Sequence, residues 1–147
     1  MVKASIPETV ETVLTIYGNQ LKQGIEIVKL YQNTPLILCY PDELTQVWSN
    51  LISNAIQAMN GRGRLEIAIL EQENQVIVKI TDSGQGIPAD IQAKIFEPFF
   101  TTKSMGEGSG LGLDIVRKIV DKHHGKVEFD TQAGKTTFIV CLPIAQG

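Results

Sequence analysis

Apolar side chains recur at helical spacing in three stretches of the chain. The clearest stretch runs from about Asp42 to Met59, where one stripe holds Leu44, Val47, Trp48, Leu51, Ile52, Ala55 and Met59. The same spacing predicts a helix over Pro7 to Gln23 and another over Gly110 to His124, which ends at Gly125. We therefore expect three helices.

Short runs rich in β-branched and aliphatic residues separate these helices. They predict strands over Ile25 to Leu30, Leu36 to Cys39, Leu65 to Leu70, Val76 to Thr81, Lys126 to Asp130 and Thr136 to Leu142. Polar residues between the third and fourth runs indicate a hairpin or an adjacent pair. Three helices and about six strands in this order predict an α+β fold, a two-layer sandwich. One mixed sheet of about five to six strands would carry the three helices on one face.

The bulk composition is that of one globular domain. The chain has 147 residues, of which 43% are hydrophobic and 20% charged. A net charge of −3 gives no general attraction for nucleic acid or for an anionic membrane, so an anionic ligand must be held by a local arrangement. No apolar run approaches 18 residues, and we expect a cytoplasmic domain without direct membrane contact.

Two asparagines, Asn50 and Asn54, lie four residues apart along the edge of the longest predicted helix. Asparagine is a poor helix former and costs up to about 0.7 kcal/mol relative to alanine at each interior site. The side-chain carbonyl of Asn54 can supply one neutral ligand to Mg²⁺, which takes few protein oxygens and otherwise binds water and phosphate. The alternative interpretation is a pair of amides that only face solvent.

Asp82 ends a predicted strand, and Gly84 and Gly86 follow within four residues. Glycines let the backbone approach a ligand closely, so the carboxylate would be fixed beside such a surface. A carboxylate accepts a hydrogen bond from the exocyclic amine of adenine, where guanine presents a carbonyl. The segment indicates adenine recognition, and the alternative is a turn in which Asp82 only caps itself.

Glycine occupies every second position from Gly106 to Gly112, directly before the last predicted helix. A helix N-terminus presents unpaired N–H groups and the positive end of its dipole, which favours a phosphate. The run is not a P-loop, since no Gly-Lys-Ser/Thr closes it, and no strand immediately precedes it as in a dinucleotide fingerprint. The alternative is a flexible loop that only begins a helix.

The segment from Pro88 to Gly108 is long for a connection inside a compact domain, which usually indicates function. It contains the aromatic residues Phe96, Phe99 and Phe100. Their bulk in a loop bounded by glycines suggests a lid held by aromatic packing, with Lys103 as its phosphate contact. The phenylalanines can equally serve the core, and Lys103 can be a plain surface lysine.

His123 and His124 invite a catalytic interpretation, but they close the last predicted helix just before Gly125. Cations are favoured at that end of a helix, so we expect a structural role for both. Cys39 and Cys141 each lie in an apolar run without a second cysteine nearby, which predicts reduced core thiols and no zinc site.

These motifs together resemble those of sensor histidine kinases. Asn50 to Ala55 resembles the N box, Asp82 to Gly86 the first glycine box, Phe96 to Phe100 the F box and Gly108 to Leu113 the second glycine box. The likeness covers about Asp42 to Leu142, and Phe-Phe-Thr-Thr-Lys is similar to the lid of kinases of the nitrogen-regulation type. The resemblance implies the Bergerat sandwich shared with DNA gyrase, heat-shock chaperones and mismatch-repair ATPases.

The resemblance also implies ATP and Mg²⁺ as ligands. By position it places Asn54 on Mg²⁺, Asp82 on the adenine amine, and Gly84 and Gly86 around the base. The further implied nucleotide contacts are Lys103, Gly108, Gly110, Leu111 and Gly112. The implied catalytic residues are Asn50 and Lys103.

Two departures from the family pattern matter. Gln57 stands three residues after Asn54, where many members have a lysine, so Lys103 would carry that charge alone. The phosphoacceptor motif, a histidine followed by an acidic residue and a nearby proline, is absent, and neither histidine matches it. We therefore expect residues 1–24 to be a helix and connection from a missing acceptor domain, and residues 25–147 to be the ATP-binding catalytic domain.

The resemblance implies donation of the ATP γ-phosphate to a histidine on a separate dimerisation and phosphoacceptor domain, with a response-regulator receiver domain as a further partner. One alternative is an ATP hydrolase or a serine-kinase anti-sigma factor of the same fold. Those relatives carry a glutamate base at the position of Asn50, and an amide cannot take a proton from water. The other alternative, which nothing in the sequence excludes, is a regulatory module that binds nucleotide without chemistry.

Overall fold

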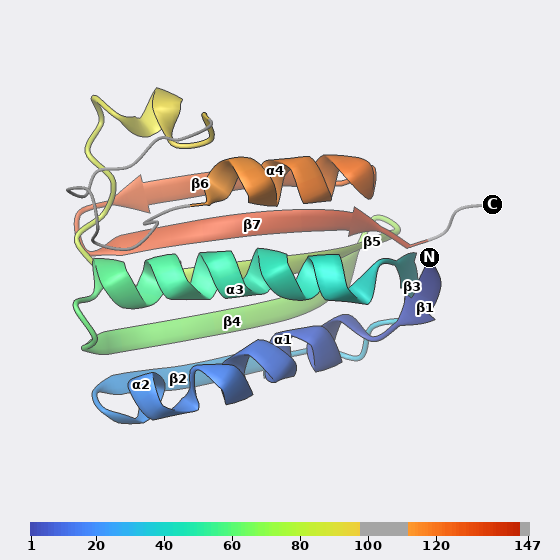
Figure 1. The fold of residues 1–147 in the computed structure, drawn as a ribbon, viewed down its shortest axis with the longest axis horizontal. Helices are drawn as coiled ribbons and strands as arrows, with labels where there is room; N and C mark the ends of the chain where they lie inside the picture. Colours follow the sequence, from blue (N-terminus) through green and yellow to red (C-terminus); the bar gives the residue numbers. More distant parts are fainter. Residues whose placement is uncertain (98–111, 145–147) are drawn as a thin grey trace.

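The computed structural model describes residues 1–97 and 112–144, which form a layer of helices on a twisted sheet (Figure 1). The strands are β1 Val2–Ala4, β2 Ile25–Tyr31, β3 Ile37–Cys39, β4 Gly63–Gln72, β5 Gln75–Asp82, β6 Lys126–Gln132 and β7 Lys135–Pro143. The helices are α1 Ile6–Ile16, α2 Gly18–Lys22, α3 Pro41–Ala58, α4 Leu113–Lys122 and the 3-10 helix η1 Gln92–Lys94.

The main sheet has five strands in the order β2-β4-β5-β7-β6. Only β2 and β4 pair in parallel, and the other neighbours pair antiparallel. This confirms the predicted mixed sheet and the hairpin of β4 and β5. The strand predicted over Leu36 to Cys39 forms as β3, but it pairs with β1 in a separate two-stranded ribbon that the sequence pattern did not reveal.

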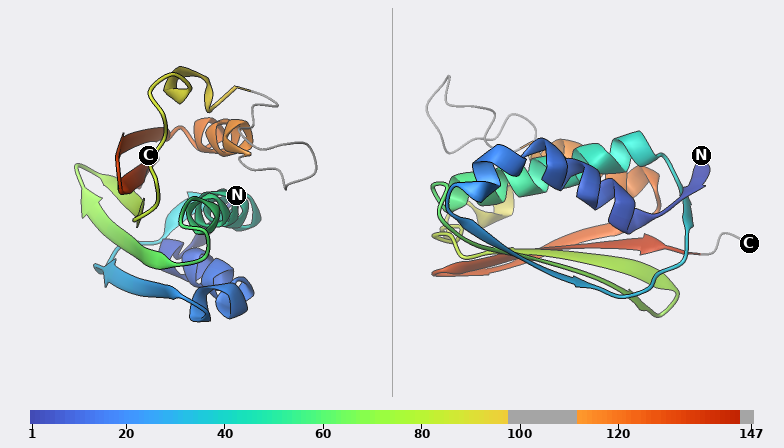
Figure 2. Two further views of the ribbon diagram at one scale, coloured as in Figure 1. Left: turned by 90° about the vertical axis from the view of Figure 1, so that its left-hand side faces the viewer. Right: turned by 90° about the horizontal axis from the view of Figure 1, so that it is seen from below.

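The helices cover one face of the main sheet, as the views in Figure 2 show. The predicted stripe of α3 is its buried face, with each of its apolar side chains at most 6% exposed. The helix predicted over Pro7 to Gln23 is instead two helices, because the backbone leaves helical geometry at Tyr17, before Gly18. Among the described helices, none has both the length and the apolar character needed to cross a membrane.

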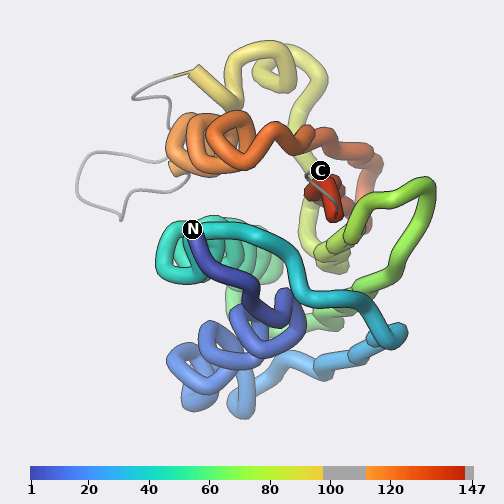
Figure 3. The backbone as a smooth tube through the Cα atoms, turned by 90° about the vertical axis from the view of Figure 1, so that its right-hand side faces the viewer, coloured from blue at the N-terminus to red at the C-terminus, as the bar shows by residue number. Residues whose placement is uncertain are grey.

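Helix α1 lies beside α3 and completes the core (Figure 3). Its buried residues Ile6, Val10 and Val13 are fully excluded from solvent. Trp48, also fully buried, donates from Nε1 to Thr9 Oγ1 at 2.8 Å, which satisfies both polar groups inside the core. Residues on both sides of the expected boundary at residue 24 therefore share one hydrophobic core.

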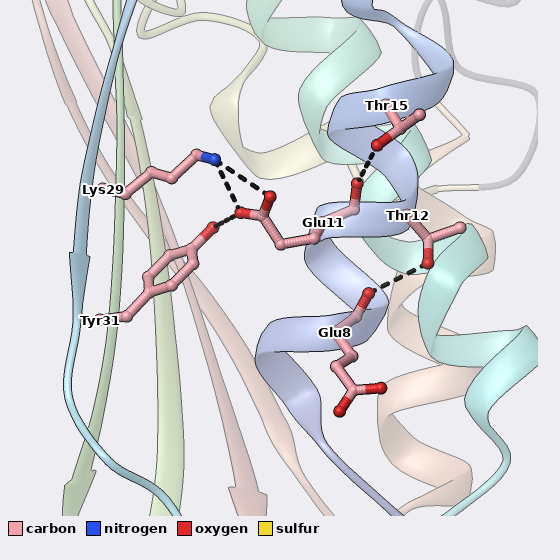
Figure 4. A network of polar contacts seen from close by, with 6 residues as sticks. All are labelled: Glu8, Glu11, Thr12, Thr15, Lys29 and Tyr31. Atoms are coloured by element: carbon pink, nitrogen blue, oxygen red, sulfur yellow. Dashed lines mark hydrogen bonds and ion pairs between the residues drawn. The ribbon is translucent and has the colours of Figure 1, made fainter.

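A polar contact ties α1 to the edge strand β2 (Figure 4). Lys29 Nζ and Tyr31 Oη donate to the two carboxylate oxygens of Glu11 at 3.0 and 2.8 Å. Burial raises the pKa of Glu11, but the hydrogen bonds from Lys29 and Tyr31 together outweigh it, so the net shift is downward. Burial, followed by the hydrogen bond to Glu11, raises the pKa of the Tyr31 phenol. Figure 4 thus shows how the first helix is held against the sheet.

Candidate nucleotide-binding site

A cavity of about 350 Å³ lies between the C-terminal half of α3, the loop after β5 and the start of α4. It is lined by Asn54, Gln57, Ala58, Asp82, Gln85, Gly86, Ile87, Pro88, Ile91, Ile95, Leu113, Thr136 and Phe138. Its size falls in the range of small-ligand sites, and its lining is apolar with a few polar groups, as is typical of them. The cavity brings together three of the four sequence motifs.

Helix α3 contributes Asn54, Gln57 and Ala58, whose spacing puts them on one side of the helix. Asn54 is partly buried in this wall. Asn50 is not part of the lining. Its Nδ2 donates to the backbone carbonyl of Gly112 at 3.0 Å, which joins α3 to the residue that precedes α4.

Asp82 is the buried carboxylate of the cavity, with a side chain only 5% exposed. Its Oδ1 accepts a hydrogen bond from the backbone N–H of Gly84 at 2.8 Å. Burial raises the pKa of Asp82 more than the bond from Gly84 lowers it. Asp82 therefore caps its own turn, as one interpretation of the sequence predicted, and also lines a cavity, as recognition of a ligand requires.

Gly84 and Gly86 are needed for a reason that differs in part from the expected one. A Cβ on Gly84 would lie 2.6 Å from the carbonyl oxygen of Ala58 in α3. Gly86 has a φ of +83°, and a Cβ there would lie 2.6 Å from the carbonyl oxygen of Gln132. Both glycines let this loop pack against the protein's own backbone, which shapes the cavity before any ligand is considered.

A threonine that the sequence analysis missed lies next to Asp82. Thr136 is 3% exposed, lines the cavity and pairs directly with Asp82 across β5 and β7. Its Oγ1 shares a hydrogen bond of 2.7 Å with Thr131 Oγ1, which also accepts from the Ile87 N–H at 3.0 Å. The signal was a threonine in phase with the buried residues Phe138 and Val140 of the same strand.

Phe96 shows the aromatic packing that was predicted for its segment. Its ring centroid lies 6.0 Å from that of Phe129 and 6.5 Å from that of Phe138, and Arg117 Cζ lies 5.9 Å from it on α4. The chain leading to residue 97 is thus anchored to α4 and to two strands. The other predicted residues of this region, Phe99, Phe100, Lys103, Gly108, Gly110 and Leu111, lie outside the described residues.

Gly112 is the residue directly before α4 and has a φ of +58°. Its carbonyl accepts both the Val116 N–H at 3.2 Å and the Asn50 amide. Leu113, the first residue of α4, lines the cavity, so the N-terminus of a ten-residue helix faces it. This end of the helix was the part of the glycine motif expected to favour an anion.

The two histidines have the structural place that was predicted, but for a different reason. His123 is 4% exposed, its Nδ1 donates to the carbonyl of Ile119 at 2.8 Å, and its Nε2 accepts the Tyr40 N–H at 3.0 Å. A ring that accepts at Nε2 is neutral, so it does not act as a cation on the helix dipole. His124 is exposed, has a φ of +60° and follows the capping residue His123.

Within residues 1–97 and 112–144, no three His, Cys, Asp or Glu side chains gather where they could hold a metal ion. The cavity instead offers two partly buried side-chain amides, Asn54 and Gln57. This donor set fits Mg²⁺ held mainly by phosphate and water better than a metal caged by protein ligands.

The chain is similar in sequence to a family of ATPases and to sensor histidine kinases. Residues 39–146 match the family described as histidine kinase-, DNA gyrase B- and HSP90-like ATPase. The sensor histidine kinase ZraS of Escherichia coli strain K12 is 46% identical over 111 residues, which cover 75% of this chain and 23% of that protein. The sensory histidine kinase/phosphatase NtrB of Proteus hauseri is 32% identical over 95% of this chain and 43% of its own length.

Solved structures agree over nearly the whole chain. The catalytic domain of the histidine kinase ThkA superposes with a TM-score of 0.88 at 30% identity, covering 97% of this chain and 95% of that one. ThkA in complex with the response regulator protein TrrA matches with a TM-score of 0.84 and 28% identity, covering 98% of this chain and 42% of that one. The chain thus spans less than half the length of these two relatives and of the ThkA chain in that complex.

Proposed function

This chain belongs to the family of histidine kinase-, DNA gyrase B- and HSP90-like ATPases as a catalytic domain of the sensor histidine kinase type, and we propose that it donates the γ-phosphate of Mg-ATP to a histidine on a separate helical domain. The observation that carries the proposal is the buried carboxylate of Asp82 in a cavity that also receives Asn54 and the N-terminus of α4. Binding of Mg-ATP needs these three features in one place, for the adenine ring, the Mg²⁺ ion and the phosphates respectively.

Asp82 is the proposed adenine contact. One of its oxygens already accepts from Gly84, and the carboxylate is held in the cavity, where it can accept from the exocyclic amine of adenine. The apolar residues Ile91, Ile95 and Phe138 line the same cavity and suit the faces of a base. The roles of Gly84 and Gly86 are then to shape this half of the site.

The phosphates would extend toward the start of α4. Asn54 is the proposed Mg²⁺ ligand, and Gly112 is the described member of the proposed phosphate loop, with Gly108, Gly110, Leu111 and Lys103 as its further members. Bound Mg²⁺ would neutralise charge on the transferred phosphoryl group. The protein's own part in such a transfer is to bind and orient ATP, with Asn50 and Lys103 as the proposed catalytic pair.

The proposed partners are a histidine-bearing dimerisation domain and the receiver domain of a response regulator. The relatives are longer than this chain, and ThkA has been solved with its response regulator protein TrrA, which supports both partners. In this proposal residues 1–24 lead in from the acceptor domain, residues 25–147 form the catalytic domain, and the domain works in the cytoplasm.

Hydrolysis of ATP by this chain alone is disfavoured by the contact of Asn50. Hydrolytic relatives are expected to hold a glutamate base there, whereas the Asn50 amide is engaged as a donor to the Gly112 carbonyl. An amide, unlike a carboxylate, is not basic enough to take a proton from water, and the bond to Gly112 fixes its orientation. We therefore expect slow hydrolysis of ATP, and phosphate transfer only when the acceptor histidine is present.

Transfer of labelled phosphate tests the proposal. The chain should bind Mg-ATP without labelling itself, and it should label the histidine-bearing domain of the same protein when that domain is added as a separate polypeptide. Asn54→Ala should abolish transfer while weakening ATP binding less, since the Asp82 side of the cavity remains. Asn19→Ala, on the exposed face of α2, is the matched control and should transfer normally.

Two outcomes would contradict the proposal. Rapid hydrolysis of ATP without any acceptor would favour the hydrolase alternative. Tight ATP binding without any transfer to the acceptor domain would favour a module that binds nucleotide only to regulate a partner.

A further inference from the structure

Strand β3 is apolar on both of its faces, although only one face is covered. Ile37 and Cys39 are 2% and 0% exposed and belong to the core. Leu36, Leu38 and Tyr40 alternate with them and are 55%, 41% and 37% exposed. A strand with one face toward solvent normally alternates apolar and polar residues, so this second apolar face is unusual.

Exposed apolar side chains are concentrated on this ribbon and at its ends. Of the eight large hydrophobic residues that are exposed in the described part of the chain, five lie there. Val2 pairs with Cys39 and so lies on the opposite face, whereas Leu36, Leu38 and Tyr40 alternate along one face. We call these three residues the ribbon patch: Leu36, Leu38 and Tyr40. Because scattered exposed hydrophobics need no explanation but gathered ones do, the patch indicates a contact surface.

The ribbon patch lies at the end of the molecule opposite the loop after β5 that lines the cavity (Figure 1). A rigid connection joins the two ends, since α3 begins at Pro41, directly after Tyr40, and runs to Ala58 in the cavity wall. His123 accepts the Tyr40 N–H, and the ring of Tyr40 packs edge-on against it at 5.6 Å. A partner on the patch would therefore contact a part of the domain that is fixed to both α3 and α4.

We propose that the ribbon patch is a docking surface for an amphipathic helix of the histidine-bearing domain. This inference rests on the proposed function, which requires such a domain to meet this one. The relatives extend well beyond the matched region, so they contain further chain that a patch of this kind can meet. Any polypeptide joined ahead of Met1 would leave the domain from β1, the strand beside the patch, which keeps that polypeptide's nearby helices close to the surface.

The dimensions and charge of the patch fit such a helix. Alternate residues of a strand are about 6.7 Å apart, so Leu36 to Tyr40 spans about 13 Å, the length of two to three helical turns. Lys3 pairs directly with Leu38 and so shares its face, and Lys3 makes no ion pair within the described residues. The matching helix would present apolar residues one turn apart with a carboxylate toward Lys3.

A surface of three side chains is smaller than a stable interface between separate proteins requires. A covalently joined partner needs less, because the linkage gives a local concentration of about millimolar. The docking we propose is therefore weak and reversible. This is what a catalytic domain needs if it is to leave the acceptor histidine after transfer.

Titration of the chain with the separately produced histidine-bearing domain, followed by the methyl NMR signals of leucine and isoleucine, tests the inference. The signals of Leu36 and Leu38 should shift on binding. The double variant Leu36→Gln, Leu38→Gln should raise the Kd by about tenfold or more while ATP affinity stays unchanged. Leu30→Gln, at a site that is 52% exposed on β2, is the matched control and should leave the Kd unchanged.

Failure of this inference can be told apart from failure of the proposed function. An unchanged Kd in the double variant, no binding by the unaltered chain, or self-association through the patch would overturn the docking surface. Transfer measured in the full-length kinase would then still decide the function. Conversely, docking that is lost in the double variant, together with no phosphate transfer by the unaltered protein, would leave the surface standing and overturn the kinase proposal.

Discussion

Two buried ionisable side chains, Asp82 and His123, differ in how completely the protein satisfies them. They are 5% and 4% exposed. Both ring nitrogens of His123 are bonded to backbone groups, from Tyr40 and Ile119. Asp82 has a backbone bond from Gly84 at one oxygen and belongs to the wall of a cavity. Equal burial thus accompanies a structural role at His123, and at Asp82 a carboxylate that a ligand in the cavity can reach.

The comparison teaches that burial alone does not identify a functional residue. Removing water from a polar group is unfavourable unless protein groups replace the lost hydrogen bonds. At His123 the protein replaces them, and the ring fastens the end of α4 to the start of α3. At Asp82 the protein supplies one backbone hydrogen bond and burial raises the pKa, which is the condition expected where a ligand can add a further partner.

The largest expected effect is on nucleotide selectivity at Asp82. Asp82→Ala should weaken ATP binding by up to about 150-fold and remove the preference for ATP over GTP, because a mismatched buried polar group costs about 1 to 3 kcal/mol. Calorimetry with both nucleotides measures this. Equal binding of ATP and GTP by the unaltered chain would show that Asp82 does not recognise adenine.

Substitution of His123 should instead change the stability of the fold. His123→Ala leaves the Tyr40 N–H and the Ile119 carbonyl without their partner and should lower the free energy of unfolding by about 2 kcal/mol. ATP affinity of the folded protein should stay within about twofold, well below the effect at Asp82. Urea denaturation and calorimetry give the two values, and His124→Asn, at the exposed neighbour, is the control. A large loss of ATP affinity in His123→Ala would mean that His123 is not merely structural.

A smaller effect of opposite sign should follow from removing the charge of Asp82. Burial disfavours the Asp82 carboxylate, so Asp82→Asn should stabilise the nucleotide-free chain at neutral pH by on the order of 1 kcal/mol. The folded pKa is raised above the ordinary value of 3.8, so the unfolded chain ionises first as the pH rises.

The pH dependence follows from that order. Well below pH 3.8 Asp82 is protonated in both the folded and the unfolded chain, so burial of its charge costs no stability. Stability is lost as the pH rises from there through the folded pKa, because only the unfolded chain ionises freely. The difference in unfolding free energy between the unaltered chain and Asp82→Asn should therefore grow across that window and then level off. A difference that stays constant with pH would show that Asp82 is not strained by burial.

The smallest effect is expected at a polar contact that is satisfied but exposed. The side chains of Lys29 and Glu11 are 43% and 42% exposed, so solvent screens the pair. Glu11→Gln should lower the unfolding free energy by about 0.5 kcal/mol, and high salt should reduce the difference. Denaturation at low and high salt measures this, with Glu26→Gln, at an exposed site on β2, as the control. A loss as large as that in His123→Ala would show that burial does not set the strength of these polar contacts.

Much of the fold was readable from periodicity because each long element has one buried face. The stripe of α3 and the alternation in β7 both carry this signal. The ribbon of β1 and β3 carried none, since three residues are too few for a period and β3 is apolar on both faces. The break at Tyr17 also escaped, because the apolar spacing continues across it to the buried Leu21.

The site was predicted where chemistry and local sequence coincide, as at Asp82 and its glycines. Thr136 was missed because it lies more than fifty residues from Asp82 in the chain, and only the pairing of β5 with β7 brings them together. The role of Asn50 was likewise invisible, since its partner is a backbone carbonyl at Gly112. Sequence motifs name side chains, whereas backbone partners emerge only from the fold.

The parallel pairing of β2 with β4 has a consequence for the order of folding. The pairs β4–β5 and β6–β7 are hairpins, and the first closes through Glu73 and Asn74, whose φ values of +52° and +64° suit a two-residue turn. Such hairpins form within about 10 μs. β2 can join β4 only after β3 and α3 have been laid across the gap, which is a slower, non-local step. The sheet should therefore assemble from its antiparallel strands first and lose its pairing first at β2. The strands that line the cavity, β5 and β7, should remain paired.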